Sequence, residues 1–373
     1  MIFIKEQNKM YRHKRFFDRF FTIGSATKDF AHRSLLLNIE LDKDGRFNFT
    51  LSATSLIEGK SNLLNNPVFV SRINSFIKDI ENIKDIADII NVQRQLSSFT
   101  DDFLPLEIRK YLLANKSLYD YLVIEDDSID FNIPYGILFF PDKSDGLSIS
   151  GKGYFLAELY TPIRAIQEKS SNKTDIPVSE IEKVCVLSTD DLKGSIQEEK
   201  SIIDYFNSKK NNIAVSIQDE VQLEKELANQ NCNLYHFCCH GNNKCQIVTV
   251  KKGTPRYLDT DFFNLCKFPQ NTTIFLNICS SNFTVYDGIT YRSISKKLIN
   301  REAELIIMTE WPINDSVAFR MGTEFYNRVI EKKESALSAI HNIKKSFTTI
   351  PEKLTAITYS LKGNPDMRLK IKE

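Results

Sequence analysis

The fold is decided by residues 234–241, which read LYHFCCHG and contain a short apolar run that ends abruptly at His240 and Gly241. Residues 273–281, TIFLNICSS, have the same form and end at Cys279 and two serines. Short apolar runs between polar turn residues are typical of parallel strands that are buried on both faces. We therefore expect two buried strands, one with a histidine and the other with a cysteine at its carboxyl end.

The chain after residue 181 alternates apolar runs with helical periodicity. This alternation indicates an α/β fold, in which parallel strands have helices on both faces. The predicted elements are strands at 184–188, 214–218, 304–309 and 355–361, helices at 195–207, 221–229, 289–299, 316–331 and 335–347, and an irregular segment from 241 to about 271. Functional residues in such sheets collect beyond the carboxyl ends of the strands. If the two strands are neighbours, His240 and Cys279 face each other there.

His240 and Cys279 have the chemistry of a nucleophilic pair. An imidazole beside a thiol can accept the thiol proton and leave a thiolate near neutral pH. A histidine upstream of a cysteine is a known arrangement in cysteine proteases, and here the separation is 39 residues (279 − 240 = 39). Gly241 lets a substrate approach its N–H, which suits an oxyanion hole shared with the N–H of Cys279.

Each residue of the pair also has a simpler interpretation. A histidine at a strand end is often a packed core residue, and free cysteines are among the most buried residues. What separates Cys279 from the other cysteines is its position at a strand end, before Ser280 and Ser281. His236 shares a strand face with His240, and we interpret it as a buried, hydrogen-bonded structural residue.

The N-terminal part of the chain has mixed periodicity. The predicted elements are a β-hairpin with strands at 35–41 and 46–51, helices at 67–92 and 106–114, and a strand at 119–125. The polar stretch 167–176 is the best candidate for a joint between domains. We therefore expect an α+β subdomain over residues 1–175 and a catalytic domain over residues 176–373.

Residues 10–21, MYRHKRFFDRFF, are basic and aromatic. One interpretation is a helix that docks on a membrane surface or an acidic partner. The other is an N-terminal helix that packs its phenylalanines on the protein body while its cations face water. We favour the second interpretation, because a phenylalanine-rich stripe usually marks core.

Bulk composition argues against several classes of protein. The chain has 373 residues and a formal net charge of +1, so its global charge favours neither nucleic acid nor an anionic membrane. No apolar run approaches the roughly 18–20 residues of a membrane span, and the N-terminus lacks a secretory signal pattern. A nucleotide-binding domain is disfavoured because Gly-x-Gly-x-x-Gly and Walker-type motifs are absent.

The seven cysteines are odd in number and cluster in apolar strands. This pattern disfavours a disulfide framework and favours a reducing cytoplasm. A zinc site formed by Cys238, Cys239, His240 and Cys245 is the alternative. Adjacent strand residues point to opposite faces and no C-x2-C pair exists, so we expect neither a metal nor a cofactor.

As a set, these segments resemble the CHAT family of caspase-like cysteine peptidases. The resemblance covers about residues 100–370. Residues 235–241 (YHFCCHG) resemble the family's strand ending in His-Gly, and residues 275–280 (FLNICS) resemble its nucleophile strand. The flanking motifs are 133–138 (IPYGIL, where Pro-Trp-Glu-Leu-Leu is usual), 310–315 (EWPIND) and 361–365 (LKGNP, where Gly-Asp-Pro is usual).

The resemblance implies a caspase-like three-layer sandwich, with a mostly parallel central sheet between two layers of helices. The N-terminal α+β subdomain then contains a pseudo-CHAT half. The resemblance also implies a Cys279/His240 dyad, an oxyanion hole made by the N–H groups of Gly241 and Cys279, and cleavage of a protein substrate.

Similarity to related caspase-like peptidases such as separase implies that Asp315 floors the S1 pocket and pairs with an Arg or Lys at P1. Trp311 then walls the pocket. The residues themselves leave simpler alternatives open: Asn314, Asp315 or Ser316 caps the following helix, and Trp311 is core.

Many CHAT chains carry tetratricopeptide repeats, and none is visible here. The resemblance therefore implies a separate regulatory or sensor protein, as in bacterial defence or cell-death circuits, with no direct contact to nucleic acid. Our interpretation is a cytoplasmic cysteine endopeptidase without metal or cofactor. The alternative is a catalytically silent CHAT-fold scaffold that signals by binding.

Overall fold

The computed structural model describes residues 33–373 except 53–55, 82, 84–85, 127–132, 142–152, 165–177, 211–212, 243, 265–266, 280–284, 287–290 and 365–366. The basic aromatic segment 10–21 and the polar stretch 167–176 lie outside the described residues. Among the described residues, no helix is both long and apolar enough to cross a membrane.

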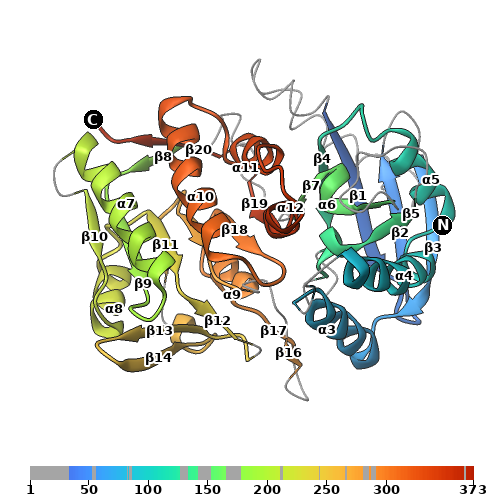
Figure 1. The fold of residues 1–373 in the computed structure, drawn as a ribbon, viewed down its shortest axis with the longest axis horizontal. Coiled ribbons are helices and arrows are strands. Elements are labelled where there is room, and N and C mark those ends of the chain that lie inside the picture. Colours follow the sequence, from blue (N-terminus) through green and yellow to red (C-terminus); the bar gives the residue numbers. More distant parts are fainter. Residues whose placement is uncertain are drawn as a thin grey trace.

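The main sheet has eleven strands, which come from both the N-terminal and the C-terminal parts of the described chain (Figure 1). Its order is β10 (Ala214–Ser216), β9 (Val184–Ser188), β11 (Leu234–Cys238), β15 (Thr273–Leu276), β18 (Leu305–Thr309), β19 (Tyr359–Gly363), β7 (Thr161–Arg164), β4 (Tyr121–Glu125), β1 (Ser34–Leu41), β2 (Arg46–Ser52) and β3 (Leu56–Leu64). The strands from β10 to β18 are parallel, and so are those from β19 to β1. The β18–β19 pair and the β1–β2–β3 meander are antiparallel.

Helices cover both faces of the C-terminal half of the sheet, as the sequence predicts. Alternate strand residues such as Val186 and Phe275 pack with α7 (Lys193–Lys209), α10 (Asp315–Tyr326) and α11 (Ala336–Lys345). The intervening residues, such as Leu187 and Ile274, pack on the other face with the helices α8 (Glu220–Asn229) and α9 (Ile294–Asn300). Both faces of each central strand are buried, which explains the continuous apolar runs in the sequence. The three-layer α/β prediction is confirmed.

The N-terminal half has its own aromatic core. The predicted hairpin is confirmed as β1 and β2, and β3 adds a third strand. The predicted helix over 67–92 is wrong in extent, because two helices occupy this region, α3 (Pro67–Glu81) and α4 (Ile86–Phe103). The ring of Phe103 lies 5.1 Å from those of both Phe47 and Phe49, so α4 packs against the hairpin. Helix α5 spans Leu106–Ala114, as predicted.

The remaining elements are short and lie around the main sheet. They are the 3-10 helices η1 (Tyr135–Ile137) and η2 (Phe262–Asn264), the helices α6 (Leu156–Leu159) and α12 (Ile350–Ala356), the π-helix η3 (Asn327–Glu331), and the strand pairs β5 (Phe139–Pro141) with β6 (Gly153–Phe155), β8 (Val178–Ile181) with β20 (Arg368–Ile371), and β16 (Val285–Tyr286) with β17 (Tyr291–Arg292).

Residues 240–258 form a small antiparallel sheet, so the prediction of an irregular stretch from 241 to about 271 is wrong as far as residue 258. Strand β12 (His240–Gly241) pairs with β13 (Ile247–Lys251), which pairs with β14 (Thr254–Leu258). Lys252 and Gly253 join β13 to β14, and both have positive φ (51° and 76°). Two successive positive φ angles define the mirror-image turn that suits a tight hairpin, and Lys-Gly is a weaker signal for it than Asn-Gly.

Candidate active site

The strands that precede His240 and Cys279 are direct neighbours in the sheet. In the parallel register of β11 and β15, Leu234 lies opposite Thr273. This register has the same offset of 39 residues (273 − 234 = 39) that separates His240 from Cys279. The two residues therefore leave the sheet at the same edge, beyond the carboxyl ends of their strands.

Gly241 lies directly against the backbone of Cys279. A Cβ atom added at Gly241 would overlap the carbonyl oxygen of Cys279 and would lie 3.6 Å from its nitrogen. A glycine is therefore required for this close approach. The approach places the residue that follows His240 directly against the backbone of Cys279.

Cys279 differs from the other described cysteines in its access to solvent. It is half-buried, whereas the other described cysteines are buried. Burial raises the pKa of the Cys238 thiol and that of the Cys239 thiol well above the ordinary value. Sγ of Cys279 lies 4.0 Å from the carbonyl oxygen of Ile313, so the thiol faces the segment between β18 and α10. A reactive thiol needs access of this kind, and the buried ones are inert.

Asp191, an acid that the sequence analysis did not single out, lies beside His240. The two carboxylate oxygens of Asp191 each lie 3.0 Å from Nε2 of His240. Burial raises the pKa of Asp191, but hydrogen bonds from Thr189 and His240 outweigh it, so the pKa lies below its ordinary value. Asp191 follows the buried strand β9, which pairs with β11, so it too lies beyond the carboxyl end of a strand next to that of His240.

Asp315 is exposed and is the first residue of α10. The cap of this helix is Asn314, whose Oδ1 accepts a hydrogen bond from the Ser316 N–H at 2.9 Å. Of the three cap candidates, Asn314 therefore does the capping. Gly194, at the start of α7, faces Asp315, since a Cβ at Gly194 would lie 3.1 Å from the Asp315 Cβ.

Trp311 lies in the core of the N-terminal half, with 3% of its surface exposed. Its indole N–H donates to the carbonyl of Leu354 at 3.2 Å. A Cβ at Gly136 would be 3.5 Å from the Trp311 ring, so the 133–138 and 310–315 motifs pack together. This position favours the core interpretation of Trp311 over a pocket wall.

A buried hydrogen-bond network lies beneath the two strands. Nε2 of His236 is 2.9 Å from Oε1 of Glu198, and Nδ1 is 2.8 Å from the Tyr326 hydroxyl. Glu198 also accepts from the Asn277 side chain at 2.5 Å, and Asn277 accepts from the Tyr359 hydroxyl. His236 is fully buried, so its predicted structural role is confirmed. The network ties β11 and the segment that precedes Cys279 to α7, α10 and β19.

The buried network and the cysteine-rich stretch 238–245 both contain potential metal ligands. Glu198, His236 and Cys238 place potential ligand atoms within 4.8 Å of one another, but Glu198 Oε1 already accepts hydrogen bonds from His236 and Asn277. Among the described residues, Cys238, Cys239, His240 and Cys245 do not converge as a ligand group. The donor set therefore fits a hydrogen-bonded core better than a zinc site.

Buried charges join the two halves of the chain near Gly136. The Gly136 N–H donates to Oε2 of Glu310 at 3.2 Å, and burial raises the pKa of Glu310 although Arg164 opposes this shift. Arg164 pairs with Asp126 at 3.1 Å. Burial lowers the pKa of Lys344 to about 7, against the attraction of Glu310. Among the described residues, Nζ of Lys344 has no hydrogen-bond partner.

We expect Lys344→Met to stabilise the protein. A buried ammonium costs more than it gains from a distant partner, so the free energy of unfolding should rise by about 1–3 kcal/mol at pH 6. Because the folded pKa of Lys344 lies below the unfolded one, the unfolded state binds more protons from about pH 7 to pH 10.5. Wild-type stability should rise with pH in that window, so the advantage of the variant should shrink.

Urea unfolding of both proteins at pH 6 and pH 9 measures this difference. Lys345→Met is the matched control, since Lys345 is the neighbouring residue but its side chain is 63% exposed. An equal gain in both variants, or a gain that does not change with pH, would contradict the prediction.

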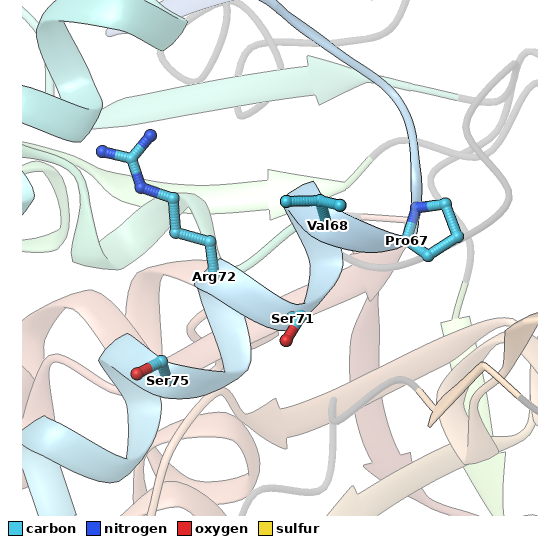
Figure 2. A pocket seen from close by; sticks show the side chains of 5 residues that line it. All are labelled: Pro67, Val68, Ser71, Arg72 and Ser75. Atoms are coloured by element: carbon cyan, nitrogen blue, oxygen red, sulfur yellow. The ribbon is translucent and has the colours of Figure 1, made fainter.

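A surface pocket lies elsewhere, along α3 of the N-terminal half (Figure 2). It is lined by Pro67, Val68, Ser71, Arg72 and Ser75. The guanidinium of Arg72 lies over the rings of Phe76 and Phe99, and the lining of the pocket contains no cysteine, histidine or carboxylate. We therefore place the candidate site at His240 and Cys279.

No protein-family model and no curated protein matches the sequence. Two crystal structures of the Saccharomyces cerevisiae separase–securin complex are similar in fold, with TM-scores of 0.53 and 0.51 and 12% sequence identity in each. The matches cover 95% and 92% of this chain but only 33% and 31% of the separase chains. At this identity the likeness is one of fold. The chain has a caspase-like α/β fold similar to that of separase.

Proposed function

We propose that this chain is a cysteine endopeptidase of the CHAT type, with His240 and Cys279 as its catalytic dyad. The observation that carries the proposal is the packing of Gly241 against the Cys279 backbone, at the carboxyl ends of two neighbouring parallel strands. The caspase-like fold and the solvent access of the Cys279 thiol support it.

The proposed reaction proceeds through an acyl-enzyme. His240 accepts the proton of the Cys279 thiol, and the thiolate attacks the scissile carbonyl. The N–H groups of Gly241 and Cys279 donate to the oxygen on which negative charge develops. His240 then gives its proton to the leaving amine. A water molecule, deprotonated by His240, hydrolyses the thioester and restores the free thiol.

We propose Asp315 as the acid that selects a basic P1 residue. Asp315 is exposed, and Asn314 rather than Asp315 caps α10, so the carboxylate is not required for capping. It lies two residues after Ile313, whose carbonyl oxygen is 4.0 Å from Cys279 Sγ. A carboxylate near the nucleophile suits a guanidinium, which it binds through two parallel hydrogen bonds.

We further propose that a protein partner controls this peptidase, in a bacterial defence or cell-death pathway. The resemblance to CHAT chains suggests such control, and the similar separase structures are complexes with securin. The described helices contain no candidate for a membrane span, so the proposal involves no membrane anchor among them.

A peptide acyloxymethyl ketone with Arg at P1 tests the proposed function. Mass spectrometry should find a single adduct, located on Cys279 of the wild-type chain. If neither a P1 Arg nor a P1 Leu probe labels Cys279, with or without candidate partner proteins, the silent scaffold is the better explanation.

We expect Asp315→Asn to lower the rate of labelling by the P1 Arg probe about 10- to 100-fold, because the charge-assisted pair between Asp315 and the P1 guanidinium is lost. Labelling by the P1 Leu probe should change less than twofold. Glu324→Gln serves as a control, since Glu324 lies on the same helix but pairs with Arg320 at 2.5 Å. Equal losses with both probes would show that Asp315 shapes the site without selecting charge.

A further inference from the structure

The loop after β9 places a carboxylate against the candidate catalytic histidine. Both oxygens of Asp191 are 3.0 Å from His240 Nε2, and Thr189 Oγ1 donates a hydrogen bond to Asp191 Oδ1. The pKa of Asp191 is lowered, so the group is a carboxylate at neutral pH and can only accept hydrogen bonds. The proton between the two side chains therefore resides on Nε2 of His240.

Strand β13 holds this loop in place. The N–H of Val250 donates to Thr189 Oγ1 at 2.9 Å, and the N–H of Asp190 donates to the Val250 carbonyl at 2.7 Å. Thr249 donates to the Ser188 carbonyl at 2.7 Å. The loop that carries Asp191 is thus bonded along its length to one strand.

The same strand also holds the histidine. His240 lies opposite Val248 in the antiparallel pair of β12 and β13. One strand therefore fixes both the acid and the imidazole, although Asp191 and His240 are far apart in sequence. An arrangement that fixes two side chains through backbone bonds is suited to orienting one by the other.

We propose that Asp191 is the positioning residue of His240, holding the Nε2–H tautomer so that Nδ1 is the atom that accepts the Cys279 proton. A neutral imidazole carries one N–H, so a proton held at Nε2 leaves the lone pair at Nδ1. When the thiol proton moves to Nδ1, the resulting imidazolium is stabilised by the carboxylate, and the same proton later leaves with the amine. This inference rests on the proposed dyad.

The solvent exposure of the His240 and Asp191 side chains distinguishes a positioning role of Asp191 from a structural one. The side chains of His240 and Asp191 are 36% and 45% exposed, so their contact should contribute little to stability. Loss of the carboxylate should therefore change the tautomer and the rate while the protein stays folded. A merely structural residue would show the opposite pattern.

The tautomer can be observed directly by nitrogen NMR of the full chain with labelled histidines. The chain has five histidines, and His240→Ala identifies the signals of His240. We expect the Nε2–H tautomer in wild type and a mixture of tautomers in Asp191→Asn, because an amide can either donate or accept. The Nδ1–H tautomer in wild type, or an unchanged spectrum in Asp191→Asn, would overturn the proposal.

Asp190→Asn is the matched control. Asp190 is the adjacent acid, and its side chain is 44% exposed, against 45% for Asp191. It faces Lys251, with an Nζ–Oδ1 distance of 3.2 Å, and accepts from the Lys252 N–H at 2.9 Å. It should leave the His240 tautomer as in wild type, and a change equal to that in Asp191→Asn would count against the proposal.

Kinetics supply the second measurement. Asp191→Asn should lower the maximal rate of Cys279 alkylation by the P1 Arg probe about 10- to 100-fold with unchanged probe affinity, and Asp191→Glu should recover part of it. A loss of affinity with an unchanged maximal rate would make Asp191 a substrate contact and overturn the proposal. If wild type shows the Nε2–H tautomer but Cys279 is never labelled, the peptidase function fails while the control of the His240 tautomer by Asp191 stands.

Discussion

Replacement of Cys279 by alanine is expected to abolish both probe labelling and peptide cleavage, and His240→Ala should lower the rate of either about 10⁴- to 10⁶-fold. Members of a nucleophile–base pair act as a unit, so the loss of one costs about as much as the loss of both. The double variant should therefore be no slower than Cys279→Ala alone. Rates of cleavage of a fluorogenic peptide with Arg at P1 measure these effects.

Cys185→Ala is the control for the thiol, because Cys185 is a buried cysteine on β9 and packs on the face away from α7. It should keep the labelling rate within about twofold, since only one small buried group is removed. Substantial cleavage by Cys279→Ala would overturn the assignment of the nucleophile. So would labelling that is independent of His240.

The second large effect concerns stability. Glu198→Ala should lower the free energy of unfolding by about 3–5 kcal/mol, because it leaves the buried His236 Nε2 donor without its acceptor and removes one of the two acceptors of Asn277 Nδ2. These groups have no access to water that could replace the carboxylate. Denaturant unfolding followed by circular dichroism measures the change.

Asp204→Ala is the matched control for Glu198→Ala, since Asp204 is an exposed acid on the same helix, α7. It should change the free energy of unfolding by less than about 0.5 kcal/mol. A loss of similar size in both variants would indicate a general effect on α7. In that case the buried network would not be the cause.

Local sequence signals were sufficient to predict most strands and helices of the C-terminal half. The apolar runs at 234–238 and 273–276 predicted buried strands because both of their faces are covered. Functional residues in such sheets collect beyond the carboxyl ends of the strands, and this rule singled out His240 and Cys279. The same rule also applied to Asp191, which follows β9, but an acid after a strand is common in loops and gave no separate signal.

The elements that were missed lack local periodicity. Strand β3 (LIEGKSNLL) is an edge strand with mostly exposed or half-exposed side chains, so it shows no clear alternation. The helix predicted over 67–92 ends early at Glu81, and α4 begins at Ile86. Trp311 could not be placed from sequence, because its burial depends on Gly136, which is distant in the chain.

The pairing of β19 with β18 and β7 has a consequence for how the protein can be divided. Leu361 lies opposite Ile307 on one side and Ile163 on the other, so a single strand is shared by both halves of the chain. Separation of the halves would leave β19 and β7 with unpaired edges. Unpaired strand edges can pair with other chains and so promote aggregation. The eleven strands therefore form one continuous sheet across both halves, and a fragment that begins after β7 would lack the neighbour of β19 on that side.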